Sequence, residues 1–398
     1  MNDPNDKKPG PSIAVSSAFW FVFTLGIVNL FADMTYEGGG SINGLFLGTL
    51  GASAAAISII AGVGEFLGYS LRLVAGYIAD RTGKPWLITF VGYSINLLAV
   101  PAMALVSDWP AAAVLIFAER VGRAIRKPTI EAMLSYTTGR YGRGWVYALN
   151  SALDETGATL GPFLIAMVLL GAGGTAYKIG YATLLVSSLL ALATLTLARF
   201  LFPAPDHLEV GSTAQAKGFP FSYWLYMIAA ACFGAGLMSF ELVSFHLSST
   251  GAVTDFWIPL FLVIATAFGV AASLLFGRLY DRYGLRVILV AVLLSCMFSP
   301  LVFFGGFFTA LAGLILWGIG YATQDTLLKA LVAGMLPEGK RNLAFGLFYA
   351  GYGCGWLVGS IATGLLYEYS LPLVVAFSVV IQLASLPLFL VARRWEKS

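Results

Sequence analysis

Runs of about 20 apolar residues recur along the whole chain, and this repetition constrains the fold more than any other feature. A helix of that length crosses the hydrocarbon core of a bilayer while it satisfies its own backbone hydrogen bonds. Hydrophobic residues make up 59% of the 398 residues and charged residues 11%, a balance too apolar for a soluble domain. The sequence therefore predicts an all-α membrane protein that has the lipid bilayer as its solvent.

The apolar runs and the polar breaks between them predict twelve transmembrane helices in two pseudo-symmetric six-helix bundles. We expect the spans at 15–49, 54–79, 85–106, 110–137, 143–171, 176–203, 221–249, 254–280, 285–305, 307–336, 342–368 and 371–393. The long polar break from Pro203 to Pro220 separates the sixth span from the seventh. We therefore expect these parts of the chain: a tail (1–14), the N-terminal bundle (15–203), a linker (204–220), the C-terminal bundle (221–393) and a second tail (394–398).

Lysine and arginine in the predicted loops and tails lie almost entirely on one side of the membrane. Sixteen of them fall on the side of the termini and the linker, and only Lys178 falls on the other. Cytoplasmic loops carry this excess of basic residues. The pattern predicts a multi-pass protein of a cell (inner) membrane with both termini and the central linker in the cytoplasm.

The remaining composition argues against several other classes of protein. The net charge of +3 indicates neither nucleic acid nor an acidic partner. The three cysteines lie far apart inside apolar runs, so no metal site and no disulfide framework is indicated. We find no nucleophile motif, no cofactor motif and no GxxxxGK[ST] phosphate loop, so we expect neither an enzyme nor a cofactor.

The two halves are related in sequence. The segment from Gly76 to Lys84 after span 2 recurs from Gly277 to Arg286 after span 8, at an offset of 201 residues. A GxxxG pair in span 5 matches a second pair in span 11 at an offset of 198 residues. Two repeats of the same topology place a transport pathway on the axis between them.

The repeated loop resembles the signature loop of the major facilitator superfamily of secondary carriers. Glycine there permits close helix approach and a tight turn, while the acidic and basic residues can form a charge latch between helices. The residues that carry the resemblance are Gly76, Asp80, Arg81, Gly83 and Lys84, and in the second copy Gly277, Asp281, Arg282, Gly284 and Arg286. The resemblance implies a monomeric, prokaryotic carrier of a small solute. It also implies a cytoplasmic gate, with Glu131 of span 4 as the nearest partner of the basic loop.

A glycine-proline motif in span 5 is similar to the one that drug:proton antiporters of this superfamily carry. It consists of Gly157, Gly161 and Pro162. The resemblance favours export of the solute. The alternative is plain helix packing, because GxxxG is common wherever membrane helices approach closely.

Charged residues inside the spans are candidates for function, because a charge at membrane depth is costly. Span 4 places its charges within an arc of about 140°, since successive helical residues are about 100° apart. Span 1 carries two acids at i and i+4 before three consecutive glycines, where we expect the helix to break. The candidate cavity residues are Asp33, Glu37, Glu65, Tyr69, Arg120, Arg123, Arg126, Asp154, Glu241 and Asp325. Proton coupling is assigned first to Asp33 and second to Asp154.

Several alternatives stay open at this point. Arg72, Lys127 and Glu131 near helix ends can form structural salt bridges. The excess of embedded acids is compatible with a cationic or zwitterionic solute, whereas the arginine stripe is compatible with a proton-coupled importer or facilitator of an organic anion. A non-transporting sensor and a lipid flippase are the alternatives of another class.

Overall fold

The computed structural model describes residues 11–82, 84–135, 143–171, 176–203, 220–324, 328, 331 and 341–396. Within these ranges it defines all side chains except those of residues 11–18, 73, 76–77, 79–81, 132, 135, 143–148, 281, 341–346 and 396. The described chain is helical almost throughout, because each apolar run must satisfy its own backbone groups in lipid.

The N-terminal half contains six spans. They are α1 (Pro11–Thr49), α2 (Ala54–Thr82), α3 (Pro85–Ala102) with a short 3₁₀ turn η1 (Met103–Leu105), α4 (Trp109–Ser135), α6 (Arg143–Gly171) and α7 (Ala176–Leu201). Pro85 stands in the first turn of α3, where its missing N–H has no helical partner to lose.

The C-terminal half contains six further spans, two of which are divided. The helices are α8 (Phe221–Leu237), α9 (Phe240–Ser249), α10 (Trp257–Tyr283), α11 (Leu285–Ser295), α12 (Phe298–Phe303), α13 (Phe307–Thr323), α15 (Arg341–Tyr369) and α16 (Leu371–Glu396). The pair α8–α9 forms one span and the pair α11–α12 another.

The predicted all-α, twelve-span fold is confirmed. Within the described residues, nine helical segments are long and apolar enough to cross a bilayer. The helix α4 is not among them, because the charged side chains of its polar stripe lower its hydropathy.

The prediction of a helix break in span 1 is wrong. The helix α1 continues from Pro11 through Gly38, Gly39 and Gly40 to Thr49. Two of these glycines serve close packing: a Cβ on Gly38 would lie 3.2 Å from the backbone of Gly161, and one on Gly39 would lie 2.7 Å from Val100. The glycines therefore let neighbouring helices approach α1 without interrupting it.

The break occurs in span 7 instead, between α8 and α9. Met238 has a φ angle of 54°. Among the described residues other than glycine, it is the one with a positive φ. The indole N–H of Trp317 lies 3.0 Å from the carbonyl oxygens of both Leu237 and Met238. Ser378 and Gln382 of α16 both donate to the carbonyl oxygen of Gly236. Side chains from α13 and α16 thus satisfy the carbonyls that the break sets free.

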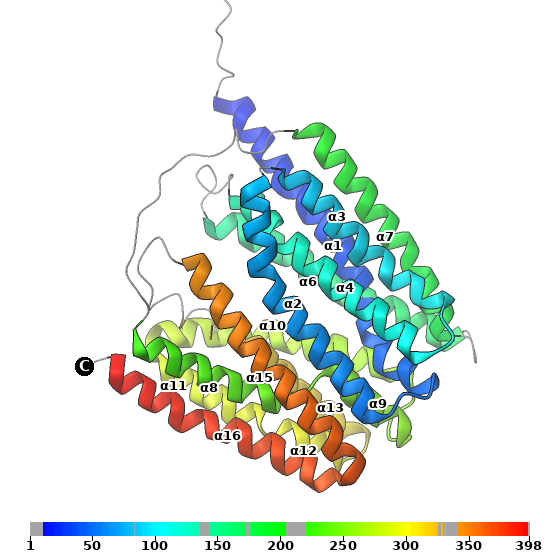
Figure 1. Cartoon of the computed structure of the whole chain (residues 1–398), viewed down its shortest axis with the longest axis vertical. Helices are drawn as coiled ribbons and strands as arrows, with labels where there is room; N and C mark the ends of the chain where they lie inside the picture. The colour runs from blue at the N-terminus through cyan, green and yellow to red at the C-terminus, as the bar shows by residue number, and fades with distance from the viewer. Residues whose placement is uncertain are drawn as a thin grey trace, which may run out of the picture.

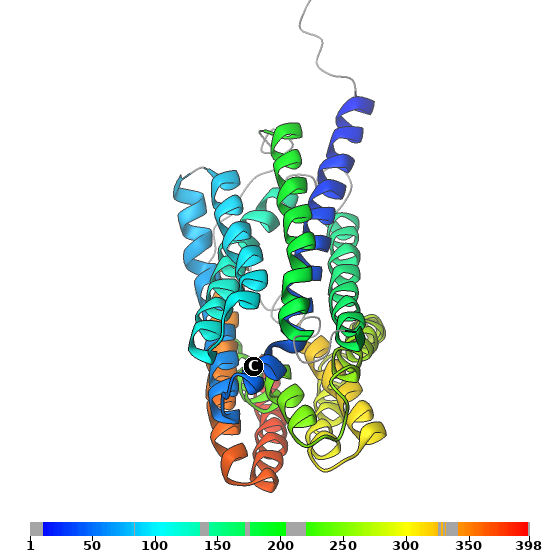
Figure 2. The same cartoon turned by 90° about the vertical axis from the view of Figure 1, so that its right-hand side faces the viewer.

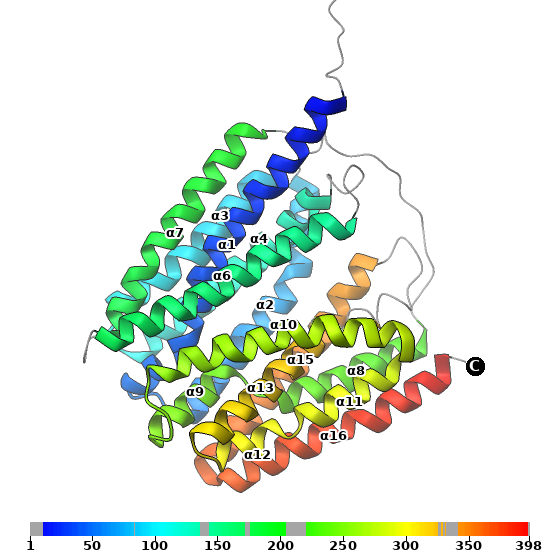
Figure 3. The ribbon, with the colours of Figure 1, turned by 180° about the vertical axis from the view of Figure 1, so that it is seen from behind.

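The two halves meet at one end and spread apart at the other. Figures 1 and 3 show their helices fanning out toward the terminal end, where α1 begins and α16 ends. We call the opposite end the loop end. There Tyr177 donates to Asp255, 2.5 Å away, and the backbone N–H of Ala55 donates to Glu368, 3.2 Å away.

Two pairs of helices join the halves along their flanks. The helix α2 packs against α15, and α6 packs against α10. These pairs lie on opposite sides of the molecule (Figures 2 and 3). Between them α1 packs against α9, with Gly44 directly against the backbone of Glu241.

Candidate functional site

Three arginines of α4 form the centre of an ionic network in the N-terminal half. They follow each other at intervals of three residues, so they share one face of the helix. Arg120 lies about 17 Å along α4 from its first residue, at 1.5 Å per residue, so it lies near the middle of the span. Such a depth requires carboxylate partners, because an unpaired charge is costly there.

Arg120 contacts three carboxylates. Its guanidinium lies 2.9 Å from Glu65 of α2, 3.3 Å from Glu119 of α4 and 3.3 Å from Glu241 of α9. About one tenth of the Arg120 side chain remains exposed. The contact with Glu241 links the two halves, and within the described residues it is the one ion pair that does so.

Arg123 shares two of these carboxylates. It lies 3.5 Å from Glu65 and 3.5 Å from Glu119. Its guanidinium also lies over the ring of Tyr36, 4.7 Å from the ring centre. The cation–π contact and the two carboxylates together hold Arg123 against α1 and α2.

Arg126 connects the network to α1 and α6. It lies 3.7 Å from Asp33 and donates to Asn96 and Asn29. Asn29 in turn donates to Asn150, 2.9 Å away, and Asn150 donates to Asp154, 3.1 Å away. Both predicted proton-coupling acids are therefore linked to Arg126, Asp33 directly and Asp154 through two amides.

The ion pairs contain more acids than bases. Within the described chain the six ion pairs join three arginines, Arg120, Arg123 and Arg126, to four carboxylates, Asp33, Glu65, Glu119 and Glu241. Four acids minus three bases leaves one negative charge if all groups are ionised. Glu37, one turn from Asp33, forms no ion pair with the described residues and adds to this excess.

Tyr69 lies where the sequence placed it, on the same face of α2 as Glu65. Arg72 of the same helix lies over its ring, 5.0 Å from the ring centre, and its hydroxyl reaches the other half. Its hydroxyl accepts a hydrogen bond from Gln324, which also accepts one from Tyr352. The offset between the repeats aligns Gln324 with Arg126 and Tyr352 with Asp154. In the C-terminal half this pair is neutral and joined by a direct hydrogen bond, whereas in the N-terminal half it is charged and joined through Asn29 and Asn150.

The predicted gate is described in part. Lys84, Arg282 and Arg286 are exposed at the terminal end, as is Glu131 of α4, and Gly277 and Gly284 are partly exposed. Gly83 and Asp325 lie outside the described residues, and so do the surroundings of Gly76 and the side chains of Asp80, Arg81 and Asp281. The gate therefore stays a prediction.

The glycines of the span 5 motif lie in the contact between α6 and α1. A Cβ on Gly157 would lie 2.1 Å from the carbonyl oxygen of Leu30, and one on Gly161 would lie 2.3 Å from that of Met34. These distances leave no room for a side chain. Pro162 follows inside α6 without ending the helix.

Sequence reasoning missed the uncharged members of the network. Asn29 stands four residues before Asp33, and Asn150 stands four residues before Asp154, so both amides share a helix face with an acid. That spacing was a usable signal. Nothing in the sequence places Asn96 of α3 beside Arg126, because the contact depends on the packing of α3 against α4.

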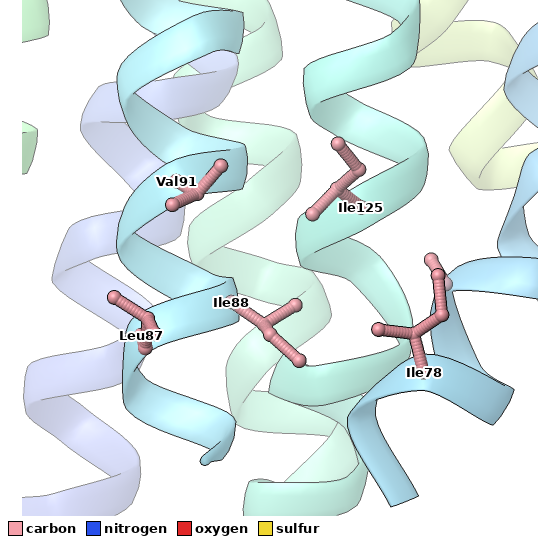
Figure 4. Close-up of a pocket in the computed structure, with 6 residues that line it drawn as sticks. Ile78, Leu87, Ile88, Val91 and Ile125 are labelled. Carbon is pink, nitrogen blue, oxygen red and sulfur yellow. The ribbon is translucent and has the colours of Figure 1, made fainter. Parts of the chain in front are cut away.

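A separate apolar pocket of about 260 Å³ lies between α2, α3 and α4 (Figure 4). Its lining is entirely aliphatic and consists of Ala75, Ile78, Leu87, Ile88, Val91 and Ile125. Ile78, Leu87 and Val91 are about half exposed on the outside of the bundle. Lipid tails would cover such a surface, so this pocket does not extend the polar site.

Comparison with known proteins gives a consistent result over nearly the whole chain. The family model of the Major Facilitator Superfamily matches residues 13–299 and 221–397. An uncharacterized protein of Mycobacterium tuberculosis is 32% identical over 384 residues, which cover 95% of this chain and 94% of the relative. An uncharacterized MFS-type transporter of Methanocaldococcus jannaschii is 25% identical over 361 residues, which cover 88% of this chain and 89% of the relative.

Solved structures show the same fold at low sequence identity. The nucleoside transporter NupG is 13% identical and has a TM-score of 0.73, covering 95% of this chain and 99% of its own. A peptide transporter POT in complex with sulfate is 14% identical with a TM-score of 0.74, covering 95% of both chains. At these identities the likeness concerns the arrangement of helices alone.

Proposed function

Since the chain belongs to the Major Facilitator Superfamily and is a multi-pass membrane transporter, we propose that it is a proton-coupled secondary active transporter. It carries a small solute by alternating access. The absence of a phosphate-loop motif in the sequence supports an ion gradient as the source of energy. The observation that carries the proposal is the ion pair between Arg120 and Glu241, which joins the halves inside an acid-rich network.

The network provides a route by which a proton can change the conformation. When Glu241 takes up a proton, it loses its charge and its attraction to Arg120. Arg120 keeps Glu65 and Glu119, so no arginine is left unpaired. Protonation therefore weakens the contact between the halves without leaving a buried charge alone.

Asp33 and Asp154 are the proposed carriers of the proton within the N-terminal half. Arg126 pairs with Asp33 and reaches Asp154 through Asn29 and Asn150. A carboxyl that alternates between an arginine and an apolar environment binds a proton in one state and releases it in the other. We expect the surroundings of both acids to change when the halves, which spread apart at the terminal end here, move to close it.

Direction and orientation complete the proposal. The terminal end faces the cytoplasm of a prokaryotic cell, because it carries most of the loop lysines and arginines. Export is favoured by the motif of Gly157, Gly161 and Pro162. It is also favoured by a probable sugar efflux transporter of Haemophilus influenzae that is 29% identical over 188 residues, 45% of this chain.

Proteoliposomes with an imposed pH gradient test the proton coupling and identify the solute in the same experiment. Vesicles are incubated with a cell extract of small metabolites, and mass spectrometry identifies the compounds that accumulate. We expect gradient-dependent accumulation with wild type. Asp33→Asn, Asp154→Asn and Glu241→Gln should abolish accumulation while downhill exchange continues.

The matched control is Asp108→Asn, an exposed acid in the loop before α4, which should leave accumulation unchanged. Accumulation by wild type that ignores the pH gradient would overturn proton coupling. Undiminished accumulation in all three variants would overturn the assignment of these acids.

A further inference from the structure

A row of aromatic contacts and the ionic network together form a ring, in which Phe240 adjoins Glu241 along the chain and Tyr69 adjoins Glu65 along α2. The row begins at Phe240, directly before Glu241, and passes through Trp317, Tyr321, Trp356 and Tyr352 to Tyr69. Successive ring centres are 5.3–6.3 Å apart, within the range of direct aromatic contact. Tyr69 stands one helical turn from Glu65 on α2, and Arg120 binds both Glu65 and Glu241, so the ring closes on one guanidinium.

The ring has two chemically different sides. One side holds the carboxylates Glu65 and Glu241, with Glu119 behind Arg120. The other side holds the aromatic residues of α13 and α15, with no charged side chain in the row. Five helices from both halves contribute, so the ring lies at the meeting of the halves.

The local charge at the ring favours a cation. Arg120 contacts three carboxylates, and Arg123 shares two of these three, so three acids face two bases. An organic anion would have to displace these carboxylates from the arginines, whereas a cation adds the missing positive charge. Aromatic rings attract cations in the same sense through their negative faces.

Trp356 adds an independent sign of a ligand. It is 5% exposed, and its indole N–H has no hydrogen-bond partner among the described residues. A buried indole N–H normally finds a partner, and the other tryptophan of the row, Trp317, does so at the α8–α9 break. The aromatic row therefore contains a buried donor that no described residue satisfies.

We propose that this ring of residues binds an organic cation with an aromatic group. The ring comprises Arg120, Glu65, Glu241 and the aromatic row from Phe240 to Tyr69. The ammonium group pairs with Glu65 and Glu241. The aromatic ring of the solute packs against Tyr321 and Trp356. The inference rests on the proposed transport function and names its substrate class.

Binding of three matched small molecules to purified wild type in detergent tests the proposal, with no pH gradient and no transport. The probes are phenethylamine, the anion hydrocinnamate of similar shape, and cyclohexylethylamine, which keeps the charge but lacks the aromatic ring. We expect phenethylamine to bind at millimolar concentration and each of the other two to bind more weakly. Loss of the aromatic contact in Trp356→Leu should weaken phenethylamine roughly fivefold to tenfold.

Two control variants distinguish the contribution of the ring to binding from general effects on folding. Trp356→Phe keeps the aromatic face and should retain most of the affinity. Trp395→Leu changes an exposed tryptophan at the end of α16 and should have no effect. Equal or tighter binding of hydrocinnamate, equal binding of cyclohexylethylamine, or no binding of phenethylamine by wild type would overturn the proposal. Because proton coupling is measured separately as gradient-driven accumulation, either result can fail while the other holds.

Discussion

Arg126 shows at the scale of a single residue how the network is held together. Only 3% of it is exposed, and it donates to two asparagines on different helices. It also lies over the ring of Tyr93, 4.5 Å from the ring centre. A buried guanidinium with this many partners organises the helices around it, because each partner loses its own hydrogen bond when Arg126 is removed.

We predict that Arg126→Met destabilises the protein by about 3–5 kcal/mol, since it leaves the buried Asp33 without its charged partner. Thermal unfolding of the purified protein in detergent measures the change. Arg286→Met, at an exposed arginine, is the control and should unfold like wild type. If both variants unfold at the wild-type temperature, the network contributes nothing to stability.

The residues of the network could be predicted from the sequence in part. The stripe on α4 followed from the spacing of its charges, and Glu65 and Asp33 followed from their depth in apolar runs. The pairing could not be predicted, because it depends on which helices α4 touches. Glu241 stood out only as an embedded acid, and its contact with Arg120 required the two halves to be placed together.

At the scale of a helix, the interruption between α8 and α9 is stabilised by side chains distant in sequence. Trp317 donates to two carbonyl oxygens of the interruption, and Ser378 and Gln382 donate to a third. Met238 adopts a left-handed conformation that is unfavourable for a side chain with a Cβ. The geometry therefore persists because the surrounding helices hold it.

We predict that Trp317→Phe loosens this interruption, because it leaves the carbonyl groups of Leu237 and Met238 without their donor. Each unsatisfied buried carbonyl costs about 1–3 kcal/mol. Hydrogen exchange read by mass spectrometry should show faster exchange in peptides that cover 236–243. Trp395→Phe is the control, and exchange at the wild-type rate in Trp317→Phe would contradict the prediction.

Apolar runs predict where a span lies but not whether it is continuous. Three glycines in α1 indicated a break, yet neighbouring helices use two of them for close contact. The sequence around Leu237 and Met238 carries Gly234 and Gly236 and no proline, and its break depends on α13 and α16. Interruptions stabilised by other helices cannot be predicted from the local sequence.

At the scale of the whole molecule, the halves touch most closely where α1 meets α9. A Cβ on Gly44 would lie 2.1 Å from the carbonyl oxygen of Glu241, a backbone atom that cannot move aside alone. The loop end can therefore close in this way only with glycine at position 44.

We predict that Gly44→Ala shifts the protein toward states in which the loop end is open. Spin labels at the exposed positions Thr49 and Ser249 should show a longer mean distance than in wild type. Gly40→Ala is the matched control on the same helix, because a Cβ there meets nothing within 4 Å. An unchanged distance distribution in Gly44→Ala would show that the halves tolerate the added group.

The single ion pair between the halves, among the residues that the structure describes, has a consequence for the speed of transport. Arg120 retains two carboxylates when the halves separate, and Glu241 lies in the first turn of α9, where the helix N-terminus favours a negative charge. Arg120 and Glu241 therefore each keep a favourable interaction within their own half when the halves separate. We therefore expect this ion pair to add little to the barrier between states, which would suit rapid cycling better than long residence in one of them.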